Sequence, residues 1–354
     1  MNGFADCKPL DLGGLKIKLP IIQGGMGVGI SLSSLAGAAA KEGAAGIIST
    51  AQIGFRDPDF EKDPLQANLR AIPKHVKRAR EIAGGGVIGV NIMVATKEYA
   101  RYVAEAVKSG VDLIISGAGL PMELPKLTKG SRTKLLPIVS SLKAAELILK
   151  TWKRRYDRLP DGIVVEGPKA GGHLGFKKEA LKDAQGLHYE EEIKSIISYV
   201  RQFGQQFGQY IPVITAGGIR CREDVEKQRS LGADGVQVAT RFVPTEECDA
   251  SMAYKEAYIE CRKEDIVIVN SPVGMPGRAI RNAFIRRTET EKEPIRKCFG
   301  CLSGCRPDTA PYCITKALIN AAKGDIDNAL LFCGAEAYKE TRIRTVKEVL
   351  AELL

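Results

Sequence analysis

The stretch "IPVITAGGIRCREDVEKQRSLGADGVQVATRF", Ile211 to Phe242, decides the fold. A β-branched run ends in Ala216, Gly217 and Gly218, an amphipathic segment follows, and a second β-branched run ends at residues 239–241. Glycine N–H groups, a threonine hydroxyl and a helix N-terminus can converge there on a dianion. This order and spacing are typical of the seventh and eighth units of a phosphate-binding (β/α)8 barrel. The alternative is that these glycines only turn tight corners.

The chain upstream repeats the same alternation. Apolar runs alternate with helical patterns eight times before residue 245, in the order "PIIQGG", "AGIIST", "VIGVNIM", "DLIISGAG", "LLPIVSS", "GIVVEG", "IPVITAGG" and "GVQVATRF". Continuous apolar strands separated by helices are typical of a parallel sheet with both faces covered. We therefore predict a closed (β/α)8 barrel over residues 1–243, with an open doubly wound sheet as the alternative. The usual fingerprint of the open sheet, GxGxxG, is only imitated by "GGMGVG" at residues 24–29.

Composition narrows the classes of partner. The 52 Lys and Arg residues exceed the 42 Asp and Glu residues, which gives a net charge of +10 spread along the chain. Few aromatic residues lie among the basic ones, so we expect an anionic small-molecule substrate or cofactor rather than nucleic acid. No apolar stretch is long enough to span a bilayer, and the first residues lack a secretory pattern. We therefore expect a soluble cytoplasmic protein with no membrane partner, and leave a homodimer open.

A cysteine-rich stretch, "KCFGCLSGCRPDTAPYC" at residues 297–313, stands apart from the barrel pattern. Its cysteines are Cys298, Cys301, Cys305 and Cys313. In a cytoplasmic protein such a cluster favours a metal–thiolate site over disulfides. Four thiolates suit a [4Fe–4S] cluster or tetrahedral zinc, with a slight preference for iron–sulfur. The alternative is four reduced cysteines with a packing role.

Five stretches together resemble a known family. They are "PIIQGGMG" from Pro20, "GVNIM" from Gly89, "EGPKAGGHLGF" from Glu166, "PVITAGGI" from Pro212 and "GVQVATRF" from Gly235. In this order they resemble the nitronate monooxygenase (2-nitropropane dioxygenase) family of FMN-dependent barrels. The flavin-dependent type II enoyl-acyl-carrier-protein reductases are close relatives of that family. The resemblance implies FMN across the C-terminal mouth of the barrel.

The resemblance also assigns the cofactor contacts. The backbone of residues 25–26 would face the flavin ring, Asn91 its polar edge, and Glu166 the ribityl or ring side. The glycines and the run at 237–240 would hold the phosphate. The full set implied is Gly25, Met26, Asn91, Glu166, Gly171, Gly172, Gly217, Gly218, Gln237, Val238, Ala239 and Thr240. For Asn91 the alternative is a cap of the next helix.

His173, inside "VVEGPKAGGHLGF", is one of three histidines. The two glycines before it can bring the backbone close to the flavin, which would place the imidazole over the ring. In the resembling family this histidine serves as general base or as anchor for an anionic substrate, and the pKa of an imidazole suits either task. The alternative is a histidine that fills a turn. His75 and His188 are interpreted as surface residues.

Two residues depart from the family pattern. Lys169 stands where relatives commonly carry an acidic residue, which favours an anionic substrate. Ala239 replaces a commoner glycine but leaves the backbone N–H available.

The remaining chain is assigned through the resemblance. Residues 244–297 would form a helical cap over the barrel mouth, with Met275 and Arg278 as candidates for the substrate entrance. Residues 298–354 would form the cysteine-rich loop and terminal helices that pack on the barrel. In relatives, a glycine-containing turn in the region of Gly334 returns toward the active site.

The predicted activity is oxidation of alkyl nitronates to a carbonyl compound and nitrite. The first alternative is an NAD(P)H-dependent FMN reductase of enoyl thioesters or quinones. A flavin-free phosphate-sugar lyase or isomerase, and a flavin/iron–sulfur electron carrier, are alternatives from other classes.

Overall fold

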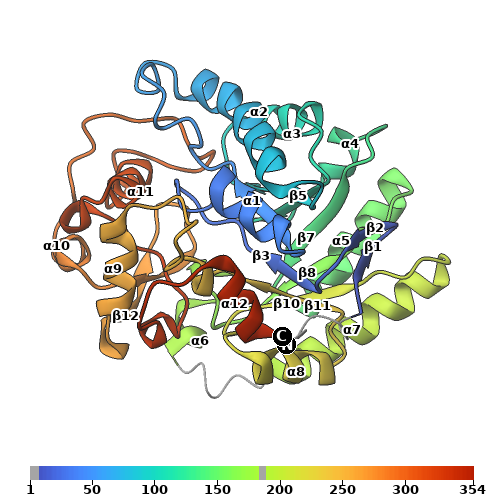
Figure 1. Cartoon of the computed structure of the whole chain (residues 1–354). Helices are drawn as coiled ribbons and strands as arrows, with labels where there is room; N and C mark the ends of the chain where they lie inside the picture. The colour runs from blue at the N-terminus through green and yellow to red at the C-terminus, as the bar shows by residue number, and fades with distance from the viewer. Residues whose placement is uncertain (1–7, 183–188) are drawn as a thin grey trace.

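The computed structural model describes residues 8–182 and 189–354, and its centre is a closed barrel of parallel strands (Figure 1). Around the barrel the order is β10-β11-β3-β4-β5-β6-β7-β8. The strands are β3 (Ile21–Gln23), β4 (Ala45–Ser49), β5 (Ile88–Met93), β6 (Leu113–Gly117), β7 (Lys134–Val139), β8 (Ile163–Glu166), β10 (Val213–Ala216) and β11 (Gly235–Val238). Seven of the eight lie within a predicted run, and β7 begins one residue before its run, at Lys134. The (β/α)8 prediction is therefore confirmed, and the open-sheet alternative is wrong.

A short hairpin closes the N-terminal end of the barrel. It consists of β1 (Leu10–Leu12) and β2 (Leu15–Ile17), which pair antiparallel. Leu12 and Ile17 belong to the same buried cluster as the inward-facing Ile47 and Ile214. Because one end of the barrel is filled in this way, a ligand site is left to the opposite end, where the strands finish.

Helices cover the outside of the barrel. They are α1 (Ser33–Lys41), α2 (Pro64–Ala83), α3 (Tyr99–Lys108), α4 (Leu124–Leu127), α5 (Leu142–Tyr156), α6 (Lys178–Lys182), α7 (Tyr189–Gln206) and α8 (Arg222–Ser230). Helix α2 begins where Asp63 accepts the N–H of Gln66 and Pro64 occupies the first turn. The last helix of the chain, α12 (Val346–Leu353), contacts both α1 and α8 (Figure 1). The C-terminus therefore completes the ring of helices around the barrel.

The segment after the barrel contains strands as well as helices. It comprises α9 (Met252–Glu260), β12 (Ile266–Asn270), β13 (Pro276–Ile280) and α10 (Ala283–Thr290), followed by α11 (Ile314–Lys323). The segment predicted as a helical cap is therefore not all helical: its Pro/Gly-rich stretch includes β13, which pairs with β12 and with β9 (Gly172–His173). The β-branched "IVIVN" run of β12 supplies the partner that makes this strand stable. Strand β13 thus holds His173 in a small sheet.

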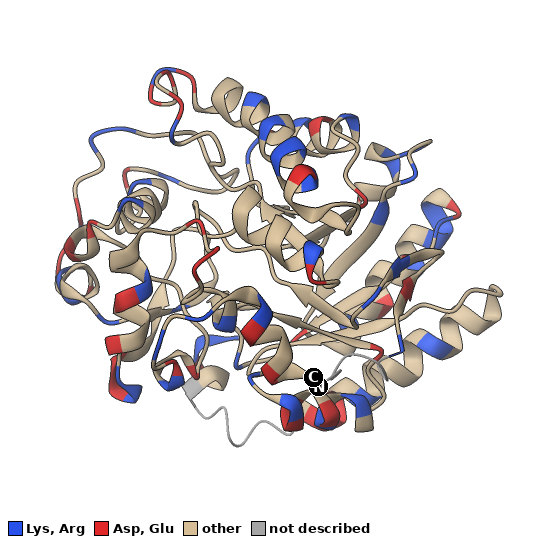
Figure 2. Cartoon of the chain, in the orientation of Figure 1, with Lys and Arg blue, Asp and Glu red and all other residues tan. Residues whose placement is uncertain are grey.

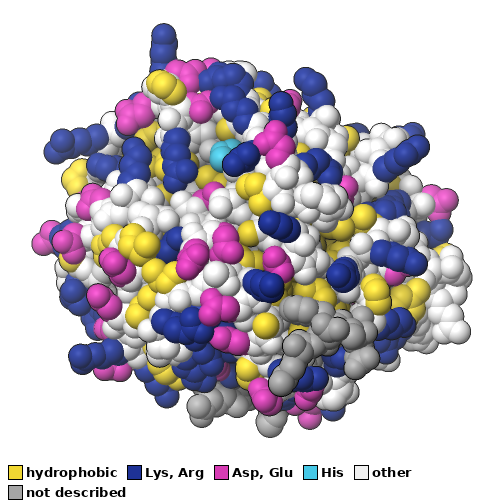
Figure 3. All heavy atoms as spheres, viewed as in Figure 1, with side chains coloured by type: hydrophobic (Ala, Val, Ile, Leu, Met, Phe, Trp, Pro, Cys, Tyr) yellow, Lys and Arg dark blue, Asp and Glu magenta, His cyan; other side chains and the backbone are white. Residues whose placement is uncertain are grey.

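Charge is dispersed over the molecule. Lys and Arg lie on many separate helices (Figure 2), and on the face shown in Figure 3 they are interspersed with Asp and Glu. The basic stretches "HVKRAR" and "TWKRRYDR" fall on α2 and at the end of α5, as expected for solvated helix faces. Within residues 8–182 and 189–354, no helix has the length and apolar character to cross a bilayer.

Candidate active site

A cavity of about 240 Å³ lies at the C-terminal ends of the barrel strands. It is far larger than the roughly 10–15 Å³ that one water needs, so it has room for a sizeable ligand. Every residue predicted to bind a cofactor lines it: Gly25, Met26, Asn91, Glu166, Gly171, Gly172, Gly217, Gly218, Gln237, Val238, Ala239 and Thr240. His173 lines it as well. The structure therefore brings the whole predicted set together.

One end of the cavity is a cradle of backbone groups. Gly217 and Gly218 have φ of +102° and +80°, which side-chain-bearing residues rarely adopt. A Cβ on Gly217 would lie 2.9 Å from the backbone nitrogen of Ala170, so only glycine fits. The Thr240 hydroxyl accepts the N–H of Gly334 at 3.1 Å, which leaves its own proton free to donate into the cavity. This cradle can bind a dianion such as a phosphate.

The other side of the cavity combines closely packed backbone with polar side chains. A Cβ on Gly25 would lie 2.5 Å from the Cβ of Asn91, so backbone at Gly25 packs directly against that side chain. Asn91 does not cap the next helix, because α3 has Glu98 at its N-cap. Gln237 presents a buried Oε1 with no hydrogen-bond partner among the described residues. A ligand with a polar edge would satisfy such an atom.

Glu166 ends strand β8 and faces the cavity. Enclosure by protein raises the pKa of its carboxyl to about 8, because burial disfavours the charged form. Its backbone carbonyl accepts the hydroxyl of Tyr189 at 2.9 Å. At neutral pH the carboxyl is therefore mostly protonated and can donate a hydrogen bond to a ligand.

His173 is a partly buried, neutral imidazole at the cavity wall. Its Nε2 lies 2.8 Å from the Ser271 hydroxyl, and the ring of Phe332 meets it edge-on at 4.9 Å. Burial lowers the pKa of His173 to about 4. Strand β13 fixes the backbone, since Gly277 pairs with His173. The imidazole is thus held in a form that can accept a proton at neutral pH.

The substrate-entrance prediction for Arg278 and Met275 is not supported, since neither lines the cavity among the described residues. Arg278 is buried, at 4% exposure, and donates to the carbonyl of Ala170. Its place in a paired strand, β13, points it into the core. The guanidinium therefore supports the loop before His173 rather than the entrance.

A turn from the C-terminal segment closes the phosphate end, as the resemblance implied for the region of Gly334. Residues 333–336 line the cavity. The N–H of Ala335 donates to the carbonyl of Lys169 at 3.1 Å, and a Cβ on Gly171 would lie 2.6 Å from the carbonyl carbon of Cys333. Lys169 also pairs with Glu336 at 3.0 Å. We call residues 333–336 the closing turn.

Several contributors to the site were missed from the sequence. They are Ser271, Phe332, Arg220, and the two tyrosines of α9, Tyr254 and Tyr258. Both tyrosine hydroxyls donate to the carbonyl of Phe332, next to the closing turn. No local motif marks these residues, although Arg220 directly follows the predicted phosphate loop.

The four clustered cysteines lie in the loop that precedes α11. Among the residues described, no group of three or more His, Cys, Asp or Glu side chains could hold a metal ion. Cys298 is exposed, while burial raises the pKa of Cys301 to about 11 and keeps that thiol protonated. The loop is tethered instead by backbone contacts, including Lys97 N–H to the Cys301 carbonyl at 3.0 Å. The predicted iron–sulfur or zinc site is therefore not shown, since no metal site is found at these cysteines among the described residues.

Of the other two histidines, only His75 lies in the described part of the chain, and it does not line the cavity. His75 belongs to α2, where its Nδ1 lies 3.2 Å from the Ser33 hydroxyl. His188 lies outside the described residues.

Comparison with known proteins identifies the family to which the chain belongs. A family model described as nitronate monooxygenase matches residues 9–354. The chain belongs to the nitronate monooxygenase family. The resemblance read from the five sequence stretches is thereby confirmed, and the family supports an oxidoreductase enzyme.

Individual relatives are distant. The chain is 33% identical to a probable nitronate monooxygenase of Staphylococcus saprophyticus over 135 residues, which is 38% of this chain and 36% of the relative. It is 26% identical to a probable nitronate monooxygenase of Staphylococcus aureus over 295 residues, or 77% and 78% of the two chains.

Solved structures share the fold over most of their length. FabK from Thermotoga maritima is 25% identical with a TM-score of 0.72, covering 94% of this chain and 91% of its own. Nitroalkane oxidase from Streptomyces ansochromogenes is 20% identical with a TM-score of 0.70, covering 95% and 94%. The second likeness speaks for the fold alone.

Proposed function

We propose that this protein is an FMN-dependent oxidoreductase that oxidises alkyl nitronates to a carbonyl compound and nitrite. The observation that carries the proposal is one cavity with a dianion cradle at one end and a neutral, partly buried His173 on its wall. The residues fit FMN, because the backbone of Gly217 and Gly218 lines the cavity beside Thr240 and can donate to a phosphate. The buried Gln237 Oε1, which has no partner among the described residues, could accept a donor such as a flavin N–H. When bound, FMN would supply the electron acceptor for the nitronate and the electron donor to dioxygen.

The residues of the chain have separable tasks in this proposal. The cradle, with Thr240, would fix the cofactor by its phosphate. Asn91 and Glu166 would hydrogen-bond its polar parts. His173 would accept the proton of a neutral nitroalkane at Nδ1, the ring nitrogen that is not bonded to Ser271, or orient a nitronate that is already ionised. The Ser271 hydroxyl, 2.8 Å from Nε2, would hold the imidazole in position.

A spectrum and one anaerobic titration test the proposal. Purified protein should show the two absorbance bands of a bound flavin, at about 370 and about 450 nm. Addition of an alkyl nitronate without oxygen should bleach these bands, and admission of air should restore them with release of nitrite. A folded, colourless protein that does not take up added FMN would overturn the cofactor assignment.

A second candidate is an NAD(P)H-dependent reductase of enoyl thioesters or quinones. The likeness to FabK, over 94% of this chain, favours it. In that case NADH or NADPH, rather than a nitronate, should bleach the flavin rapidly. Reoxidation by an enoyl thioester or a quinone would then distinguish the two acceptors. Bleaching by a nitronate alone would exclude this candidate.

A further inference from the structure

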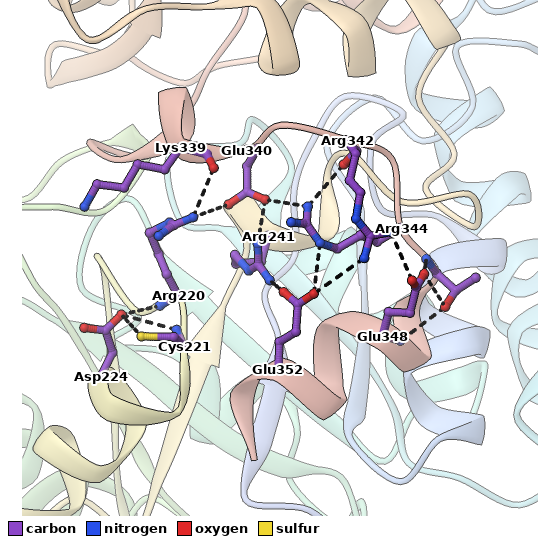
Figure 4. Close-up of polar contacts among 11 residues, drawn as sticks. Arg220, Cys221, Asp224, Arg241, Lys339, Glu340, Arg342, Arg344, Glu348 and Glu352 are labelled. Carbon is purple, nitrogen blue, oxygen red and sulfur yellow. Dashed lines mark hydrogen bonds and ion pairs between the residues drawn. The ribbon is translucent and has the colours of Figure 1, made fainter.

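Two ion-pair clusters lie beside the phosphate cradle. In the smaller one, Lys169 and Lys339 share Glu336 at 3.0 and 2.7 Å. The larger one joins four arginines to three glutamates (Figure 4): Arg220, Arg241, Arg342 and Arg344 with Glu340, Glu348 and Glu352. Each cluster therefore has one more cation than it has carboxylates. An anion at this end of the cavity would balance the excess charge.

Arg220 is the member of the larger cluster that reaches the cavity. It lies in the loop between β10 and α8, two residues after Gly218, and it lines the cavity. Its Nη2 lies 3.3 Å from Glu340 Oε1 and donates to the carbonyl of Lys339 at 3.2 Å. Its Nε is buried and has no acceptor among the described residues. One donor of this guanidinium thus remains available to a ligand.

Glu340 does not need Arg220 for its own charge balance. This carboxylate is fully buried and is already paired with Arg241 at 2.6 Å and with Arg344 at 3.4 Å. Neither of these two arginines is among the described residues that line the cavity. Two guanidinium groups are sufficient to neutralise one carboxylate, so the third contact serves to fix the position of Arg220.

We propose that Arg220 is a side-chain ligand of the FMN phosphate and that Glu340 is the residue that positions it. The inference rests on the proposed function, because it requires a flavin phosphate in the cradle of Gly217 and Gly218. Backbone N–H groups supply only partial charges, whereas a guanidinium supplies a full charge and planar donors that match phosphate oxygens. Arg220 therefore distinguishes FMN from riboflavin, which has the same ring and ribityl chain without the phosphate.

Titration of cofactor-free protein tests this assignment. Quenching of flavin fluorescence gives the Kd of FMN and of riboflavin for wild type, Arg220→Gln and Arg220→Lys. Arg220→Gln should weaken FMN binding by about tenfold or more, the effect of losing a charge-assisted hydrogen bond, and leave riboflavin binding at the wild-type value. Arg220→Lys should recover part of the loss. Inorganic phosphate should compete with FMN in wild type and compete less well in Arg220→Gln.

Arg342→Gln is the matched control. Arg342 belongs to the same cluster, but its side chain is 54% exposed and it does not line the cavity among the described residues. This variant should bind both flavins as wild type does. Equal losses of FMN and riboflavin affinity in Arg220→Gln, or no loss for FMN, would overturn the role of Arg220. Wild-type protein that binds neither flavin would overturn the proposed function itself.

Discussion

The phosphate end of the cavity is built by two regions that differ in how they reach it. The barrel rim contributes loops that directly follow strands β8, β10 and β11, so its residues are placed by the strands just before them. The closing turn, by contrast, meets this rim from far along the chain. Gly334 contacts Thr240 across 94 positions, and Glu336 contacts Lys169 across 167. The comparison shows that strand ends alone do not complete this site.

The two regions also differ in chemistry. The rim offers backbone N–H groups at Gly217 and Gly218 and one hydroxyl. The C-terminal segment brings carboxylates, Glu336 and Glu340, that hold cations near the cradle. We infer that the rim determines where a phosphate lies, while the C-terminal segment determines how much positive charge surrounds it. Variants that act on one region at a time test this division.

The largest effect is expected at His173, on the rim. His173→Ala should lower turnover by about a hundredfold or more, the lower range for loss of a general base, while the flavin remains bound. Because burial lowers the pKa of His173 to about 4, the active neutral form should persist well below pH 6.5. The acid limb of kcat/KM in wild type should therefore lie near pH 4 and be absent from His173→Ala. Unchanged turnover in this variant would contradict the catalytic role.

Gly171→Ala should push the closing turn away from the barrel rim. The new Cβ would lie 2.6 Å from the carbonyl carbon of Cys333 and 2.7 Å from the nitrogen of Gly334, and backbone atoms cannot rotate away. Forcing the closing turn outward should cost about 1–3 kcal/mol of unfolding free energy and lower FMN affinity by about tenfold or more. Chemical denaturation and flavin titration measure the two effects.

The control for this variant is Gly304→Ala. A Cβ there would meet nothing within 4 Å, and the backbone does not have a positive φ. Stability and FMN affinity should therefore match wild type. If Gly171→Ala behaves like Gly304→Ala, the closing turn does not contribute to cofactor binding.

Thr240→Val tests the single hydroxyl shared by both regions. Valine keeps the shape but removes the group that accepts the Gly334 N–H, and it leaves a bound phosphate short of one donor. Such a loss costs about 1–3 kcal/mol, so FMN affinity should fall about tenfold. Thr245→Val removes a buried hydroxyl that donates to the Phe242 carbonyl outside the cavity. It should reduce stability without changing FMN affinity, and equal FMN affinity in both variants would mean that the phosphate lies elsewhere.

Sequence reasoning recovered the rim because its signals are local. Each barrel strand is a continuous apolar run, and the residues at 216–218 and 239–241 follow their strands directly, so their position is a consequence of the fold. The strand β13 was missed because a Pro/Gly-rich stretch is typical of a loop, and only its partner β12 makes it a strand. Arg220, Ser271 and Phe332 carry no motif; their roles arise from contacts between distant segments.

The cysteine-rich loop shows the opposite failure, a strong motif without the expected structure. Spacing brings sulfurs near one another along the chain, but convergence on one point also requires the loop backbone to turn each sulfur inward. Here the backbone of the loop makes other contacts. The Lys97 N–H donates to the carbonyl of Cys301, and the Ser303 N–H donates to the carbonyl of Ala95. Motif spacing therefore predicts where thiols gather and leaves their geometry undetermined.

The smallest effect is expected at Cys298, which lies in the cysteine-rich loop and belongs to neither the barrel rim nor the closing turn. Its side chain is exposed and accepts only the Gly300 N–H, at 3.4 Å, among the described contacts. A serine oxygen can accept the same N–H, so Cys298→Ser should change the unfolding free energy by no more than about 0.5 kcal/mol, as surface substitutions do. FMN affinity should be unchanged.

Elemental analysis of anaerobically prepared wild type provides the decisive measurement. Stoichiometric iron or zinc that disappears in Cys298→Ser, together with a large loss of stability, would show that the four sulfurs do converge on a metal and that the C-terminal region is pinned by it rather than by packing.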